Sequence, residues 1–127
     1  MTQQGKNAID MVLAESLIEL STKKPIEKIT IKEITDKAGV IRPTFYNHFQ
    51  DKFELLEWII KKELLEPVQP LIRNDMFTEA MLLLFTNIER DKAFYSHVVK
   101  LEGPVTFHSI ASKCVREVLL TIINEQM

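Results

Sequence analysis

The sequence predicts an all-α fold, and three observations lead to this prediction. Apolar residues recur at helical spacing through nearly all of the 127 residues. Only three glycines and five prolines are present, which leaves few turn-forming residues for a fold built from many β-hairpins. Two stretches carry helix-capping signatures. Because 46% of the residues are hydrophobic, the chain can form a real core and global disorder is not expected.

A first helix is expected before Pro25, because one apolar stripe runs through this segment and stops near Thr22. The stripe consists of Ile9, Val12, Leu13, Leu17 and Leu20. A second helix is expected to begin at Thr30, since Thr30 and Glu33 fit the capping box, in which each side chain satisfies a free backbone N–H. Its end is expected at Gly39, where a residue with positive φ is favoured, and its core-facing residues are Ile31, Ile34 and Ala38.

A short third helix is expected to open at Pro43, only a few residues after Gly39, because proline suits the first turn of a helix. Phe45 and Phe49 are four residues apart and form its buried side, which leaves Thr44, Asn47 and His48 facing outward. Residues 51–54 are a second capping signature, Asp-Lys-Phe-Glu. It starts a long helix that is expected to end near Pro67 and that carries Leu55, Leu56, Ile59, Ile60 and Leu64.

The C-terminal half is expected to form further helices. One covers about residues 76–90 and carries on one side Phe77, Met81, Leu84, Phe85 and Ile88. Another covers about residues 91–101, and Gly103-Pro104 marks a break after it. The last covers about residues 105–126, with an apolar stripe that includes Val105, Ile110, Cys114, Val118 and Ile122.

The net charge of −2 is unevenly distributed. Residues 21–52 hold seven basic and four acidic residues, whereas the rest of the chain holds nine basic and fourteen acidic residues. A basic face on an acidic body can bind phosphate, although an ordinary solvated surface would explain the excess equally well. The single cysteine, Cys114, excludes an intrachain disulfide. No signal peptide and no membrane-spanning run is recognised, so a cytoplasmic protein is the simplest expectation.

Two helices joined by a tight turn that contains a glycine are the elements of a helix-turn-helix. The second of these helices is short, and its exposed face is polar and aromatic, which a purely structural helix does not require. The sequence therefore predicts a three-helix, helix-turn-helix DNA-binding head over residues 1–50 and a helical effector-binding and dimerisation body over residues 51–127.

The same region resembles the DNA-binding region of the TetR/AcrR family of regulators over roughly residues 8–60. The residues that carry the resemblance are Ile29–Ile34, Ala38–Val40, Thr44–Phe49, Lys52 and Leu55–Leu56. A narrower similarity, to the dihydroxyacetone-kinase-regulator subgroup, lies in Thr44–Asn47, Trp58 and the Phe94-Tyr95 pair.

The resemblance implies an all-helical homodimer in which the helix that begins near Arg42 enters the major groove, while the body binds a small effector and forms the dimer interface. The chain departs from the family pattern at Ile41, where many members carry a serine or threonine that caps the helix and contacts phosphate. Relatives also continue past the equivalent of Met127 with helices that build the dimer bundle. This chain is therefore expected to be a fragment, a degenerate member, or a member that dimerises differently.

The residues predicted to contact DNA are Thr30, Lys32, Arg42, Pro43, Thr44, Tyr46, Asn47, His48 and Lys52. Arg42 and Lys52 stand at helix starts, where backbone N–H groups also favour phosphate, and an arginine can pair with guanine. Thr44, Asn47 and His48 are candidates for base edges or phosphates, and the Tyr46 hydroxyl for a phosphate. Thr30 and Lys32 begin the helix that should cross the DNA backbone. The alternatives are solvated charges, a merely polar face, a partly buried tyrosine and a capping role for Thr30.

An effector cavity is the second predicted site, since ligand sites are mostly apolar with a few placed polar groups. Its candidate residues are Trp58, Phe77, Met81, Phe85, Phe94, Tyr95, His97, Phe107 and His108. The alternative is that these residues are simply core, because methionine and phenylalanine at helical spacing need no ligand to explain them.

The expected function is sequence-specific transcriptional regulation by a repressor that a ligand or partner modulates. The partners are operator DNA, a small effector or protein co-regulator, and a second copy of the chain, without a membrane. No cofactor, metal or catalytic set is expected, because the three histidines are far apart and no glycine-rich phosphate loop is present. A co-regulator that works mainly through a protein partner is the first alternative, and a small helical enzyme is the second.

Overall fold

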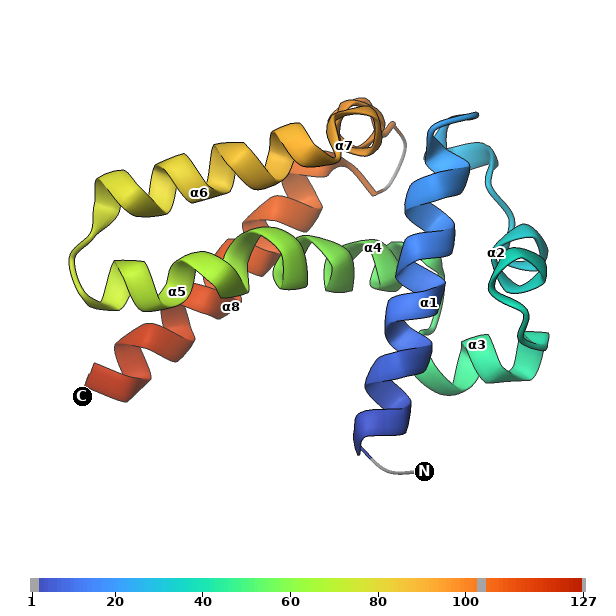
Figure 1. The fold of residues 1–127 in the computed structure, drawn as a ribbon, viewed down its shortest axis with the longest axis horizontal. Coiled ribbons are helices and arrows are strands. Elements are labelled where there is room, and N and C mark those ends of the chain that lie inside the picture. The colour runs from blue at the N-terminus through green and yellow to red at the C-terminus, as the bar shows by residue number, and fades with distance from the viewer. Residues whose placement is uncertain (1–2, 103–104, 127) are drawn as a thin grey trace.

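The computed structural model describes residues 3–102 and 105–126, and every regular element within them is a helix, as predicted. The head consists of α1 (Gln3–Ser21), the 3-10 turn η1 (Ile26–Lys28), α2 (Ile31–Ala38) and α3 (Arg42–His48). The body consists of α4 (Lys52–Ile60), the π-helical turn η2 (Lys61–Leu65), α5 (Glu66–Arg73), α6 (Phe77–Arg90), α7 (Lys92–Val98) and α8 (Phe107–Gln126). The head lies at one end of the molecule and the turn between α5 and α6 at the other (Figure 1). Over the described ranges, no helix combines the length and the apolar character that crossing a bilayer requires.

α1 contributes the centre of the head's core. Leu13 and Leu17 are completely buried, and Ile9 and Leu20 are half-buried against the same cluster. Val12 is 39% exposed, so its predicted place on the buried stripe is wrong. Val12 directly precedes Leu13, so the two side chains point about 100° apart around the helix axis, and Val12 faces solvent.

The predicted caps of α2 are confirmed. The Thr30 hydroxyl accepts a hydrogen bond from the Glu33 N–H, and the Glu33 carboxylate accepts one from the Thr30 N–H at 3.0 Å. Gly39 ends the helix in the left-handed conformation at φ 75°. The N–H groups of Gly39 and Val40 both donate to the Thr35 carbonyl, which closes the tight turn into α3.

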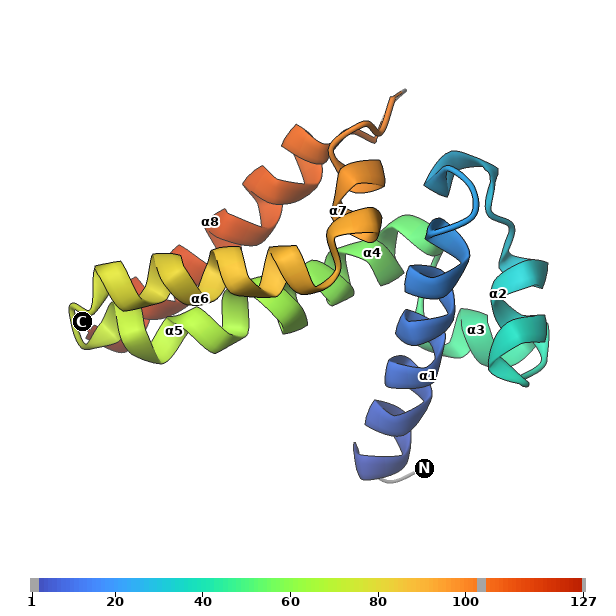
Figure 2. The same ribbon diagram turned by 45° about the horizontal axis from the view of Figure 1, so that its top comes forward.

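α4, η2 and α5 follow one another without a break and form the long rod that links the head to the far end of the body (Figure 2). The predicted end near Pro67 is wrong, because Pro67 falls in the first turn of α5, where a missing N–H is tolerated. In a regular α-helix, an N–H at position 67 would donate to the Glu63 carbonyl four residues earlier. That carbonyl instead accepts a hydrogen bond of 3.0 Å from the Asn87 side chain of α6.

α6 and α8 each bury one face and expose another apolar one. α6 buries Ala80 and Asn87, and the predicted stripe is wrong at Phe77, Met81 and Phe85, which are exposed. On α8 the predicted stripe is confirmed, since Ile110, Cys114 and Ile122 are buried and Val118 is half-buried. The predicted break at Gly103-Pro104 lies outside the described residues.

One hydrophobic core runs through both halves of the chain. Leu13 of α1, Phe45 and Phe49 around α3, Leu56 of α4 and Phe94 of α7 all belong to the same buried cluster. The head is therefore held directly against the rod and α7. A shift of α1 relative to α4 would move the whole head.

Candidate nucleic-acid interface

The short helix α3 has one face in the core and one in solvent. Phe45 and Phe49 are buried, as predicted, whereas Tyr46 and Asn47 are exposed on the opposite side. The ring centroids of Phe45 and Phe49 lie 6.0 Å apart, and these two side chains anchor the middle and the C-terminal end of the helix. A rigid helix that presents a polar face is the geometry that reads a DNA major groove.

The first turn of α3 adds further exposed side chains to this face. Arg42 and Pro43 are exposed and Thr44 is half-buried. The Arg42 guanidinium lies 5.9 Å from the centroid of the Tyr46 ring, in cation–π range. Stacking on the ring restricts the motion of the guanidinium, so less side-chain entropy is lost when it binds a phosphate or a guanine.

Ile41 is a candidate contact that the sequence reasoning did not assign. It precedes α3 without a side-chain cap, as its residue type predicts, and it is 68% exposed beside Arg42. An exposed apolar side chain at the start of a recognition helix can pack on a thymine methyl group. The sequence did contain a signal for this contact, because an isoleucine occupies the position where a residue with a capping hydroxyl is usual.

The prediction that His48 faces outward is wrong. Its Nδ1 atom lies 2.7 Å from Oδ1 of Asp10 on α1, and the two side chains are only 4% and 6% exposed. As the last residue of α3, His48 lies on the side of the helix that packs against α1, so it joins these two helices and is not available to DNA.

Lys52 has a structural role that the sequence did not reveal. Its ammonium group donates to the main-chain carbonyls of Glu27 and Ile29, both at 2.8 Å. Burial lowers the pKa of this side chain from its usual value. Lys52 thus ties the start of α4 to the segment that leads into α2. One N–H of its ammonium group remains for the predicted phosphate contact, which stays a prediction.

Thr30 and Lys32 lie exposed at the start of α2. Thr30 is engaged in the capping box, and Lys32 forms an ion pair of 2.7 Å with Asp36, one turn along. The hydrogen bond with Asp36 raises the pKa of Lys32 from its usual value. Both residues stay predicted phosphate contacts, because an exposed ion pair contributes little and exchanges readily for a phosphate.

The positive charge of the head is partly neutralised within the head itself. Lys24, Lys32 and Lys37 pair with Glu33, Asp36 and Glu19. Within residues 3–102 and 105–126, the basic side chains of segment 21–52 that form neither an ion pair nor a hydrogen bond are Lys23, Lys28 and Arg42. The basic surface offered to DNA is therefore smaller than the count in the sequence indicates.

The residues predicted to line an effector cavity are not brought together. Phe94 and Tyr95 are buried in the core, with their rings 4.9 Å apart. Met81, Phe85, Phe107 and His108 are exposed on α6 and α8, and His97 is half-buried on α7. Trp58 alone among the predicted residues lines the cavity of about 550 Å³ between α1 and the rod. The prediction fails because spacing along a helix does not determine which face meets its neighbours.

Comparison with known proteins agrees with this geometry. Residues 15–59 match the family described as bacterial regulatory proteins, tetR family. Over 91 residues, or 72% of this chain, the sequence is 25% identical to the HTH-type dhaKLM operon transcriptional activator DhaS of Lactococcus lactis subsp. lactis (strain IL1403), and this match covers 49% of that protein. Over 47 residues, or 37% of this chain, it is 40% identical to 12% of YxbF, an uncharacterized HTH-type transcriptional regulator of Bacillus subtilis (strain 168). The matched part of the chain thus spans about half the length of the Lactococcus relative.

Proposed function

We propose that the chain is a transcriptional regulator of the tetR type, which residues 15–59 match, and that α3 reads a specific operator in the major groove. The observation that carries this proposal is the two-sided character of α3. Phe45 and Phe49 fix the helix from inside, while Arg42, Tyr46 and Asn47 project outward. Operator DNA is chromosomal, so we place this function in the cytoplasm.

The exposed side chains of the head divide into two groups by chemistry. Arg42 suits guanine or a phosphate, Asn47 suits adenine, and the Thr44 methyl group and Pro43 suit an apolar contact with thymine. The Tyr46 hydroxyl, Thr30, Lys32 and the remaining Lys52 N–H suit phosphates, which position the head without reading sequence. This division predicts that base substitutions in the operator are sensed through the first turn of α3.

We propose that the working form is a homodimer, because one recognition helix reads only a half-site. Two copies would place their α3 helices about 34–36 Å apart, in successive turns of the groove. A continuous row of exposed apolar residues on the outer face of α8 supports this proposal: Val115, Leu119, Leu120 and Ile123. Such a row on a single helix face marks an interface more often than scattered exposed residues do.

Selection from random oligonucleotides, followed by measurement of the solution mass with and without the selected DNA, tests both proposals. The expected result is an enriched pseudo-palindromic site bound by two chains. Leu119→Glu should shift the mass towards the monomer and weaken binding to the full site. Enrichment of no sequence would contradict the operator-reading proposal, and a monomer bound to a single half-site would contradict the dimer.

We propose that a small molecule or a partner modulates operator binding through the body, and that the outcome is repression. The Lactococcus relative is named an activator, so the sign needs its own measurement. A reporter driven from the selected operator decides it, since repression predicts higher expression when the chain is absent.

A co-regulator that works through a protein partner is the second candidate. The exposed apolar row on α6 favours it: Phe77, Met81, Leu82 and Phe85. Failure of the oligonucleotide selection, together with retained regulation in the cell, would support this second candidate over the first.

A further inference from the structure

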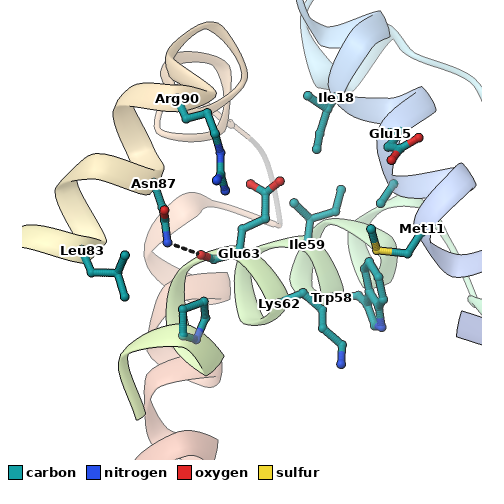
Figure 3. Close-up of a pocket in the computed structure, with 12 residues that line it drawn as sticks. Met11, Glu15, Ile18, Trp58, Ile59, Lys62, Glu63, Leu83, Asn87 and Arg90 are labelled. Carbon is teal, nitrogen blue, oxygen red and sulfur yellow. Dashed lines mark hydrogen bonds between the residues drawn. The ribbon is translucent and has the colours of Figure 1, made fainter. Parts of the chain in front are cut away.

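A cavity of about 550 Å³ lies where the head meets the body. α1 forms one wall, the rod of α4, η2 and α5 forms the floor, and α6 forms the opposite wall (Figure 3). This volume is within the usual range for sites that hold small molecules. The cavity differs from the set of residues that the sequence suggested, since it includes α1 residues from the head.

The lining of the cavity is mainly apolar, and the side chains that make it so are Met11, Ala14, Ile18, Trp58, Ile59 and Leu83. Trp58 projects from α4 towards Met11 of α1 (Figure 3). These groups favour the apolar body of a ligand, because its burial removes hydrocarbon from water.

Most polar groups at the cavity are already engaged. The Asn87 side chain donates to the Glu63 carbonyl, and the Tyr95 hydroxyl donates to the Glu63 carboxylate at 2.7 Å. Lys62 pairs with Glu66 and stacks over the Trp58 ring at 5.8 Å. Their hydrogen-bonding capacity is therefore partly used by the protein itself.

Arg90 is different. Its guanidinium projects from the end of α6 into the cavity, towards the carboxyl group of Glu63 (Figure 3). In the described part of the chain, no hydrogen bond or ion pair within 4.0 Å engages the Arg90 side chain, which is exposed and feels the Glu63 carboxyl only through its charge. A guanidinium offers a planar pair of N–H donors that matches the two oxygens of a carboxylate.

Resting on the proposed regulatory function, we infer that this cavity binds an effector that is an organic carboxylate with an apolar body. The carboxylate pairs with Arg90, and the body lies among Met11, Ile18 and Trp58. Glu15, the other carboxylate at the cavity, lies on α1 across from Arg90 and away from the proposed position of the headgroup (Figure 3).

The Glu63 carboxyl beside Arg90 is compatible with an anion. Burial and the neighbouring Asp91 carboxyl raise its pKa from the usual value, partly opposed by the hydrogen bond from Tyr95 and by the charge of Arg90. A bound carboxylate would raise this pKa further, and the protonated form of Glu63 would not repel the ligand.

The position of the cavity explains how such a ligand would act on DNA binding. α1 packs on α2 and α3 within the head, so a ligand held between α1 and the rod changes the seating of the whole head. A ligand that prefers one seating shifts the spacing of the two recognition helices and thereby the operator affinity.

The single tryptophan of the chain makes binding directly measurable without DNA. Three probes with one apolar body and different headgroups serve as ligands: 4-phenylbutyrate, 4-phenyl-1-butanol and 4-phenylbutylamine. We expect the carboxylate to change Trp58 emission with saturation and to bind about tenfold or more tightly than the other two, as a charge-assisted pair with Arg90 requires. Equal affinity of the three probes would overturn carboxylate recognition, and no emission change with any probe would overturn the site.

Variants identify the headgroup contact. Arg90→Gln should weaken 4-phenylbutyrate binding about tenfold and leave the alcohol unchanged, whereas Arg90→Lys, which retains charge without the planar pair, should fall between. Lys92→Gln is the matched control, since Lys92 is exposed and does not line the cavity. Equal loss in Arg90→Gln and Lys92→Gln would overturn the assignment. Operator binding by the ligand-free chain is scored separately, so failure of this site is distinguishable from failure of the regulator proposal.

Discussion

His48 Nδ1 and Asp10 Oδ1 lie 2.7 Å apart and join the end of α3 to α1 in a site that solvent hardly reaches. A buried carboxylate without its partner is costly, because it loses its hydration and gains nothing in return. The pair therefore fixes the angle between α3 and α1 within the head.

Replacing His48 should destabilise the protein without removing a DNA contact. We expect His48→Leu to lower the free energy of unfolding by about 2–3 kcal/mol, because the Asp10 carboxylate loses a charge-assisted hydrogen bond. Urea denaturation measures this loss. Asn47→Ala, one residue earlier and exposed, should change stability by no more than about 0.5 kcal/mol. A similar, small loss in both variants would show that the pair contributes nothing.

The local parts of the fold could be predicted from the sequence, and the distant contacts could not. The capping box at Thr30, the cap at Asp51 and the turn at Gly39 depend on residues within a few positions, and all three are confirmed. His48 was misplaced because its partner lies 38 residues earlier, and spacing within α3 does not show which side meets α1. Lys52 was assigned to phosphate for the same reason, since its carbonyl partners lie on another segment.

The cavity shows the same limit. The apolar residues of α6 at helical spacing, Phe77, Met81 and Phe85, face solvent, whereas α1 supplies cavity residues that no local pattern indicates. A helix with apolar residues on two faces leaves the choice of the buried face to its neighbours. Which face is buried depends on tertiary contacts, and these cannot be predicted from the spacing of residues in a single sequence.

Arg42 and Tyr46 should contribute to DNA binding in different ways. We expect Arg42→Ala to weaken operator binding about 10- to 100-fold, because the proposed contact with guanine or phosphate and the stack on Tyr46 are lost together. Tyr46→Phe keeps the ring and removes only the hydroxyl, so its loss should be smaller and nearly equal for specific and random DNA. Gel-shift titration over a range of salt concentrations measures both. An unchanged affinity in Arg42→Ala would contradict the assignment of α3 as the reading helix.

Variants of Lys52 and Lys28 should differ in their effects, the first lowering stability and the second leaving stability unchanged. We expect Lys52→Met to lower the free energy of unfolding by about 1–2 kcal/mol, since two carbonyl groups lose a charged donor. Lys28→Met should leave stability within about 0.5 kcal/mol of the parent. If Lys28 touches phosphate, its variant should reduce the slope of log affinity against log salt by about 1. Equal stability of the two variants in urea titrations would contradict the tethering role of Lys52.

The raised pKa of Glu63 makes a prediction about pH. Burial raises this pKa above its usual value, so the folded state holds the proton to a higher pH than the unfolded state does. Stability contributed by this group is then present at low pH and is lost as pH rises through the raised pKa.

Glu63→Gln keeps an acceptor for the Tyr95 hydroxyl and removes the titration. We expect the variant to be more stable than the parent at pH 7.5 and the difference to shrink towards pH 4, as measured by urea titration. Glu66→Gln, exposed on the same rod, is the control, and a difference independent of pH would contradict the argument.

The contribution of Asn87 to stability should depend on Pro67. In a regular α-helix the Glu63 carbonyl would accept a hydrogen bond from the N–H of residue 67, which proline lacks, and the Asn87 side chain donates to this carbonyl. We expect Asn87→Leu to lower the free energy of unfolding by about 1–3 kcal/mol, because the partly buried Glu63 carbonyl loses this hydrogen bond. Pro67→Ala supplies an N–H four residues after Glu63, so it should restore part of this loss in the Asn87→Leu background and have less effect in the parent. Denaturation of the parent, the two single variants and the double variant measures the coupling. Strictly additive effects would mean that Asn87 does not substitute for the missing N–H, and the continuity of the rod through η2 would then need another cause.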